Sequence, residues 1–197
     1  AQGHDIVSVH LSGGVSGTVE SARQAATDVV GDCRIEVVDS RSVAGGLALA
    51  VYAAQAGVDA GLDVDGVAAR AREAAETLKI WFCVDDLEYL HRGGRIGRAQ
   101  AWIGSALAVK PILSFSEGVL EPVERVRTRR RMVERMVQHL RDLGEAGQGA
   151  WLVQHVQSPD LAIELAARGT EILGCEPLCV TEAGPGLGAY PGPGLRG

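Results

Sequence analysis

The sequence lacks any long apolar run. Its 197 residues are 46% hydrophobic and 22% charged, yet no stretch approaches the roughly 18 consecutive apolar residues that span a membrane. The first residues, AQGHDIVSV, do not have the charged and then apolar layout of a secretory signal. The composition therefore predicts a globular protein with no stable membrane insertion, and we expect it to be cytoplasmic.

Cysteine is also scarce. Cys33, Cys83, Cys175 and Cys179 form no C-x-x-C pair, so neither a zinc site nor a disulfide framework is indicated. Cys83 and Cys179 lie in apolar runs, where a thiol usually behaves as a small buried hydrophobe. No other group shows metal-ligand or catalytic-triad spacing, so we expect no metal, no cofactor, no catalytic residue and no enzyme activity.

Positive charge is limited and comes almost entirely from arginine. The net charge is -6, and Lys79 and Lys110 are the only lysines. Because a nucleic-acid-binding protein normally has a basic domain, the charge argues against nucleic acid as a partner. The densest cationic group, at positions 129–131, is expected in the first turn of a helix. It indicates either a solvated face balanced by nearby glutamates at positions 121, 124 and 134, or a surface for an anionic partner.

Strand and helix patterns alternate in the first 78 residues. Strands are predicted at 5–11 and 34–40, and helices at 16–30, 43–57 and 63–78. Such alternation is typical of an α/β domain with a parallel sheet and right-handed crossovers. We expect Gly57 to end the second helix, and Asp63 or Asp65 to cap the third.

From about Lys79 the pattern changes and a second α/β domain, with a mixed sheet, is predicted over 79–197. Short helices broken by glycines are expected at 87–107, and a hairpin turning at Glu117 and Gly118. The other expected elements are strands at 79–86, 149–156 and 177–184 and helices at 128–143 and 158–169. The predicted domains are therefore 1–78 and 79–197.

The loop between the first strand and the first helix, in VSVHLSGGVSGTVESA, predicts an anion site. Backbone N–H groups and the helix dipole meet at such a position. The glycines would let the backbone approach a ligand, and the hydroxyls would donate hydrogen bonds. The candidate residues are Ser12, Gly13, Gly14, Ser16, Gly17 and Thr18. Alternatively, Ser16 or Thr18 caps the helix and the glycines form a turn. The loop matches neither the Walker A nor the dinucleotide-binding pattern.

The segment VVDSRS ends the second predicted strand at the same edge of the sheet. Ligands of α/β sheets gather at the carboxyl ends of the strands. Asp39 and Ser40 are therefore expected either to border the site or to cap the next helix.

Five ordered motifs resemble the DegV family of bacterial fatty-acid-binding proteins across essentially the whole chain. They are HLSGGVSGTVESA, VVDSRSVAGGLALAVYAA, WFCVDDLEYLHRGGRIGRAQAWIGSALAVKPILSF, VERVRTRRRMVERM and GPGLGAYPGPGL. The resemblance implies a two-domain α/β fold that binds one long-chain fatty acid. It also implies a carrier that has no catalytic step and presents the acid to a fatty acid kinase for phospholipid synthesis.

The resemblance also implies roles for individual residues. The carboxylate would lie at the serine-glycine loop, with Tyr190 nearby, where the family typically has a histidine. The tail would lie in an apolar pocket of the second domain, lined by Ile103, Leu107, Ile112 and Leu113. Arg92 and Arg95 would face the kinase; alternatively, they bond loop carbonyls or pair with nearby carboxylates.

Two further expectations concern the whole chain. The family usually carries some residues before the position where this chain starts, so the first domain is expected to be a fragment. The alternative function is an enzyme or binding protein that holds a phosphorylated small metabolite at the serine-glycine loop.

Overall fold

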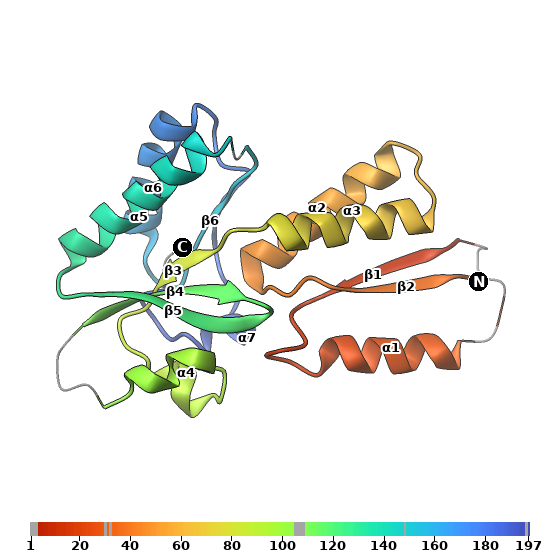
Figure 1. Cartoon of the computed structure of the whole chain (residues 1–197), viewed down its shortest axis with the longest axis horizontal. Coiled ribbons are helices and arrows are strands. Elements are labelled where there is room, and N and C mark those ends of the chain that lie inside the picture. Colours follow the sequence, from red (N-terminus) through yellow and green to blue (C-terminus); the bar gives the residue numbers. More distant parts are fainter. Residues whose placement is uncertain (1–3, 30, 32, 105–108, 148, 196) are drawn as a thin grey trace. The chain divides into compact units, whose positions relative to one another are not determined.

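The computed structural model describes residues 4–29, 31, 33–104, 109–147, 149–195 and 197. The chain forms two compact units (Figure 1). Unit 1 consists of Ala1–Lys79 with Phe115–Val119, and unit 2 of Ile80–Ser114 with Leu120–Gly197. The predicted roles of the two domains remain predictions. Within the described ranges, no helix combines the length and apolarity needed to cross a membrane.

Unit 1 is built on a parallel pair of strands, β1 (Ile6–His10) and β2 (Ile35–Asp39), with His10 opposite Asp39. Helix α1 (Thr18–Asp28) covers one face, and α2 (Ala44–Asp59) and α3 (Val64–Thr77) cover the other (Figure 1). The predicted parallel α/β arrangement is therefore confirmed. The core between strands and helices contains Val38, Ala54, Val67, Ala68 and Ala71, with Val7 and Val9 packed against it.

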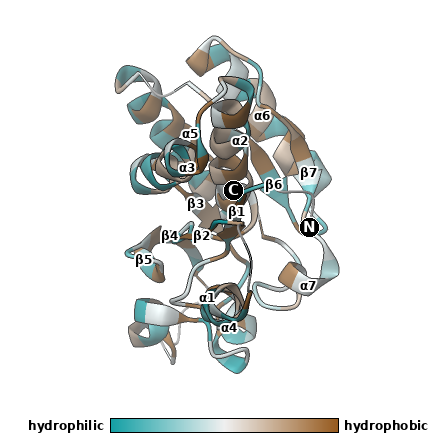
Figure 2. Cartoon of the chain, turned by 90° about the vertical axis from the view of Figure 1, so that its right-hand side faces the viewer, coloured by the Kyte–Doolittle hydropathy of each residue, from teal (hydrophilic) through white to brown (hydrophobic). Residues whose placement is uncertain are grey.

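Helix α2 is apolar along almost its whole length, as its white to brown colour in Figure 2 shows. The prediction that Gly57 ends this helix is wrong, because the helix continues to Asp59. Gly57 is instead buried against α3, where an added Cβ would lie 3.4 Å from the Cα of Val67. The glycine lets the two helices approach closely, and the turn follows at Gly61, which has a φ of +74°.

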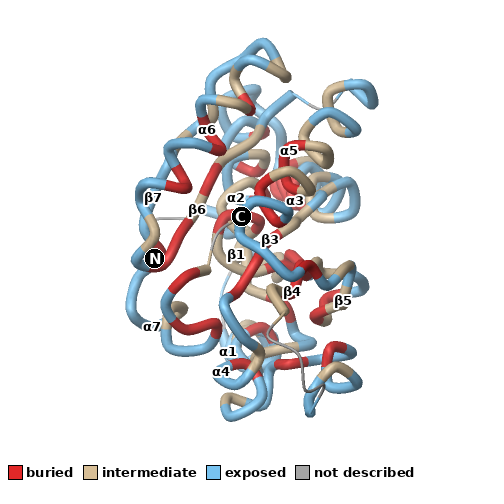
Figure 3. The backbone as a smooth tube through the Cα atoms, turned by 90° about the vertical axis from the view of Figure 1, so that its left-hand side faces the viewer, coloured by how far each residue is buried: buried red, intermediate tan, exposed pale blue. Residues whose placement is uncertain are grey.

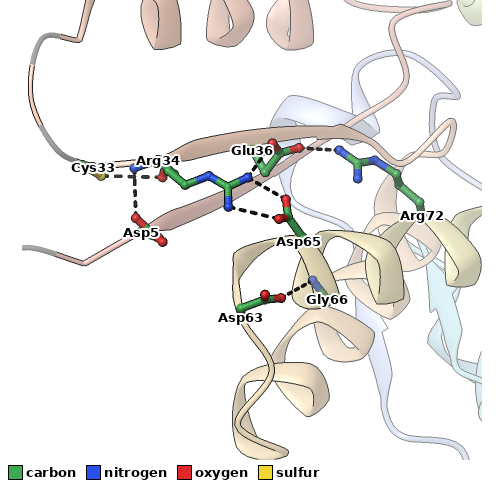
Figure 4. A network of polar contacts seen from close by, with 8 residues as sticks. All are labelled: Asp5, Cys33, Arg34, Glu36, Asp63, Asp65, Gly66 and Arg72. Carbon is green, nitrogen blue, oxygen red and sulfur yellow. Dashed lines mark hydrogen bonds and ion pairs between the residues drawn. The ribbon is translucent and has the colours of Figure 1, made fainter.

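Polar contacts fasten α3 to β2 (Figure 4). The guanidinium of Arg34 donates to both carboxylate oxygens of Asp65, at 3.0 and 2.7 Å, and Arg72 donates to Glu36 at 2.8 Å. Asp63 caps the helix by accepting a hydrogen bond from the Gly66 amide at 2.9 Å, which confirms one of the two predicted caps. These contacts hold α3 along the exposed side of β2.

Unit 2 contains two groups of strands. The first has the order β3 (Trp81–Cys83), β4 (Lys110–Ser116), β5 (Val119–Val126), and β3 pairs antiparallel with β4. In the second, β6 (Val153–His155) pairs parallel with β7 (Val180–Glu182). The helices are α4 (Glu88–Arg92), the 3-10 helix η1 (Gly97–Trp102), α5 (Arg129–Glu145), α6 (Pro159–Leu173) and α7 (Pro185–Gly188).

The core of unit 2 lies between the strands and helices α5 and α6. Buried stretches appear in red along β3 and β6 in Figure 3. Helix α5 buries one apolar face, formed by Met132, Val133, Met136 and Val137. The cluster contains Cys83, Ile112, Val126, Met132, Val133, Met136, Val137, Leu161 and Leu165.

Two of the three arginines at the start of α5 share one carboxylate of the same helix. Arg130 and Arg131 form ion pairs with Glu134 at 2.9 and 3.3 Å. Their hydrogen bonds hold the pKa of the Glu134 carboxyl below its usual value. The other two glutamates that were expected to balance this group pair with arginines elsewhere. Glu134 is thus the one of the three expected glutamates that pairs with this group, and both interpretations of the arginines stay predictions.

Replacing Ile112 by alanine tests the core of unit 2. Its side chain has no exposed surface, so Ile112→Ala should lower the free energy of unfolding by about 2–5 kcal/mol in urea denaturation. The matched change Ile163→Ala, at a residue that is 61% exposed on α6, should cost less than about 0.5 kcal/mol. Equal losses in the two variants would contradict the packing described for Ile112.

The contact between Arg34 and Asp65 should make stability depend on pH. The hydrogen bond from Arg34 lowers the pKa of Asp65 below its ordinary value of 3.8, so its contribution is present above that pH and is lost on further acidification. Asp65→Asn should lower the thermal midpoint at neutral pH. The difference should disappear as the pH falls through the lowered pKa of Asp65, and it should shrink in salt. Asp28→Asn serves as a control. A difference that persists in acid would be evidence against this ion pair.

Candidate functional site

Three segments of unit 1 meet beyond the carboxyl ends of β1 and β2. They are the loop at residues 11–17, the loop at residues 40–43, and the hairpin tip, Phe115–Val119. The Ser12 amide donates to the Ser42 carbonyl at 2.8 Å. The Ser12 hydroxyl donates to the Gly118 carbonyl at 2.5 Å. The predicted serine-glycine loop is therefore held by both neighbours.

Ser12 uses its hydroxyl inside the protein. The side chain is fully buried, and Oγ also accepts a hydrogen bond from the Gly14 amide at 3.0 Å. One hydroxyl thus fixes the shape of its own loop and fastens the hairpin tip. The predicted contact between Ser12 and a ligand remains a prediction, and the structure adds this anchoring role.

The backbones of the loop and the hairpin tip approach so closely that glycine is needed on both sides. A Cβ added at Gly14 would lie 2.5 Å from the Gly118 carbonyl oxygen. Gly118 has a φ of +77°, and a Cβ there would lie 2.6 Å from the Ser12 hydroxyl. At Gly17 an added Cβ meets nothing within 4 Å. The predicted glycines therefore differ, since close approach constrains Gly14 but not Gly17.

Asp39 borders the loop. Its Oδ2 accepts from the Gly13 amide at 3.1 Å, and its Oδ1 accepts from the Arg41 amide at 2.8 Å. The alternative prediction, that Asp39 caps the next helix, is not observed, because Val43 is the N-cap of α2 and no side chain caps it. Arg41 in turn forms an ion pair with Glu117 of the hairpin tip at 3.3 Å.

Ser16 and Thr18 carry the exposed hydroxyls of the loop. Their oxygens lie 2.7 Å apart, and the Thr18 amide donates to the Ser16 hydroxyl at 3.3 Å. Helix α1 has Gly17 as its N-cap, without a side-chain hydrogen bond, so neither hydroxyl is the cap that the alternative interpretation expects. One hydroxyl of the pair donates to the other, which leaves one neutral O–H donor for an oxygen ligand.

Sequence reasoning missed part of this arrangement. Ser42 is buried and bonds the loop through its carbonyl, and Gly118 receives the Ser12 hydroxyl. The pattern VVDSRS, with Ser40 and Ser42 directly after a strand, could have indicated that Ser42 borders the site. No local signal could have found Gly118 as a partner, because it lies 106 residues from Ser12.

In unit 2, Tyr190 and Arg95 are brought together at the end of α4. The Arg95 guanidinium lies 5.0 Å from the centre of the Tyr190 ring and donates to the Gly93 carbonyl at 2.7 Å. Arg92 pairs with Glu88 at 3.4 Å. Both local roles that were left open for the arginines, bonding a loop carbonyl and pairing with a carboxylate, are thus observed. Their role in partner docking remains a prediction.

The predicted pocket residues lie in different environments. Ile112 and Leu113 are fully buried, Ile112 within the core cluster, and Ile103 is 40% exposed just after η1. Leu107 lies outside the described residues. The described part of unit 2 also forms an open surface pocket of about 510 Å³, which none of these residues lines. Its lining consists of Val156, Gln157, Glu182, Ala183, Gly184, Pro185, Gly188, Ala189 and Pro193.

Comparison with known proteins gives one consistent result. The model of the DegV family, described as uncharacterised, matches residues 1–197. A DegV domain-containing protein of Streptomyces coelicolor is 40% identical over 193 residues, which cover 98% of this chain and 68% of the relative.

Solved structures of similar proteins share the fold. A DegV family protein from Thermus thermophilus, described as binding fatty acid, has a TM-score of 0.82 at 30% identity, and the match covers 98% of this chain and 69% of the other. DegV of Bacillus subtilis, described as a fatty acid binding protein, has a TM-score of 0.85 at 29% identity, with the same coverage. These likenesses confirm the predicted α/β fold class.

Two glycine substitutions test the close approach in the loop. Gly14→Ala should destabilise unit 1, because its methyl group would overlap the Gly118 carbonyl. A loss of about 1–3 kcal/mol in the free energy of unfolding is expected. Gly17→Ala, which meets open space, should change it by less than about 0.5 kcal/mol. If Gly14→Ala proved as harmless as Gly17→Ala in urea titrations, the loop would not pack against the hairpin tip as described.

Proposed function

Because this chain belongs to the DegV family, whose model spans its residues 1–197, we propose that it binds a long-chain fatty acid. The observation that carries the proposal is the likeness to two DegV proteins described as binding fatty acids. They are 29% and 30% identical to this chain, and each match covers 98% of it. The proposal is one of binding and transport, without a chemical step.

The head group is proposed to lie at the serine-glycine loop. Ser16 and Thr18 present neighbouring hydroxyls to solvent, and hydroxyl groups can donate hydrogen bonds to a carboxyl group. Gly13 and Gly17 are exposed backbone positions beside them. Tyr190 is proposed as a further contact, because its phenol can donate a hydrogen bond.

The acyl tail is proposed to supply most of the affinity. Each buried methylene contributes about 0.8 kcal/mol of binding free energy. A tail of ~16 carbons therefore contributes roughly 12 kcal/mol before the cost of association is subtracted. The proposed lining residues are Ile103, Leu107, Ile112 and Leu113 of the sequence. Since the tail dominates affinity, the loop would mainly set orientation and preference for an acid.

A fatty acid kinase is the proposed partner, and phospholipid synthesis the proposed destination of the acyl group. Arg92 and Arg95 are the proposed docking residues. Both side chains are exposed. Arg92 pairs with Glu88, and Arg95 donates to the Gly93 carbonyl. The planar guanidinium suits recognition of carboxylates on an acidic partner.

The first test is native mass spectrometry of the protein purified from a bacterial host, followed by extraction and identification of any bound lipid. We expect one fatty acid for each chain. If the protein instead carries a phosphorylated metabolite, or does not bind an added fatty acid in a titration, the proposal is wrong.

The double variant Ser16→Ala, Thr18→Ala tests the head-group position. Removing both hydroxyls takes away the O–H donor that the pair offers to a ligand. Fatty acid binding should weaken about fivefold, because a hydrogen bond is worth about 1 kcal/mol, while the urea midpoint stays unchanged. Ser21→Ala is the matched control, since its hydroxyl only donates to the Gly17 carbonyl within the helix. Unchanged affinity in the double variant would move the head group away from this loop.

A further inference from the structure

The loop proposed to hold a carboxylate already has an anion of the chain's own beside it. The Asp39 carboxylate accepts from the Gly13 amide at 3.1 Å and from the Arg41 amide at 2.8 Å. Helices α1 and α2 both begin just beyond this edge, at Thr18 and Ala44, and helix N-termini favour negative charge. The negative charge that these helix N-termini favour is therefore supplied by the Asp39 carboxylate.

Other amides of the loop also have partners within the protein. The Gly14 amide donates to the Ser12 hydroxyl at 3.0 Å, and the Ser16 amide donates to the Ser12 carbonyl at 3.1 Å. The Thr18 amide donates to the Ser16 hydroxyl. The Gly13 amide donates to Asp39. Because these amides are already bonded, the loop mainly offers a ligand uncharged hydroxyl groups.

Arg41, whose amide donates to Asp39, forms an ion pair with Glu117 of the hairpin tip. His10 lies opposite Asp39 in the parallel register, with its Nε2 2.7 Å from the Ser8 hydroxyl. The ion pairs on the surrounding elements are Arg41 with Glu117, Arg23 with Glu20, Arg72 with Glu36 and Arg34 with Asp65. Helix α3 also carries Arg70, Glu73 and Glu76.

We propose that Asp39 is a specificity-determining residue that makes the loop take up a fatty acid as the neutral acid rather than as its anion. This inference rests on the proposed function. Two carboxylates in one site repel each other when both are ionised, so one of them keeps a proton. The bound ligand then has a higher pKa than the free ligand. As the pH rises from the pKa of the free ligand to the pKa of the bound ligand, the affinity falls tenfold for each pH unit between the two.

Proton uptake provides the test. Dodecanoic acid is titrated calorimetrically at about pH 6 in two buffers of different ionisation enthalpy. The native protein should take up nearly one proton for each ligand bound. Asp39→Asn should abolish the uptake and raise affinity at about pH 8 by about tenfold. Dodecanol, which cannot ionise, should bind both proteins equally, which also shows that the variant is folded.

Two further variants isolate the effect of Asp39. Asp28→Asn removes the same charge at the opposite end of α1 and should leave uptake unchanged. His10→Gln should also take up the proton. If His10→Gln takes up no proton while Asp39→Asn still does, the proton belongs to the imidazole and the inference is wrong. Absence of uptake by the native protein would overturn it without any variant. If neither dodecanoic acid nor dodecanol binds, the proposed function fails first.

Discussion

The parallel register of β1 and β2 is the constraint on which the candidate site depends. Because the two strands run in the same direction, their final residues, His10 and Asp39, lie side by side. Both following loops therefore leave the sheet at one edge, and two helices begin beyond it. An antiparallel pair would send the serine-glycine loop and the Asp39 loop to opposite ends of the sheet.

Close backbone approach then gives the site its shape. Gly14 and Gly118 allow the loop and the hairpin tip to approach at distances that a Cβ would forbid. Within this contact, the buried Ser12 hydroxyl both donates and accepts. A buried hydroxyl without these partners would be costly, so the hydrogen bonds and the glycines support the same arrangement. The hydroxyls that the loop presents to solvent are those of Ser16 and Thr18.

Electrostatics separates this loop from a simple phosphate cradle. In such a cradle, free amides and a helix dipole attract an external anion. Here the Gly13 amide is bonded to Asp39, and the nearby Arg41 is paired with Glu117. A ligand with a neutral or protonated head group fits this environment better than a doubly charged phosphate. This is a physical reason for proposing a fatty acid and not the phosphorylated metabolite that the sequence also allowed.

The sequence by itself determined the α/β class, the parallel pair and the long helix of the second unit, and it limited the cap of α3 to Asp63 or Asp65, because these follow from local periodicity and capping chemistry. It also located the serine-glycine loop and suggested that Asp39 borders it. Only the tertiary structure decided what each polar group bonds. Ser12 meets Gly118 across 106 residues and Gly13 meets Asp39 across 26, and Gly57 packs against α3 instead of ending α2. Such choices depend on which backbones approach each other in space, and local sequence patterns carry no information about that approach.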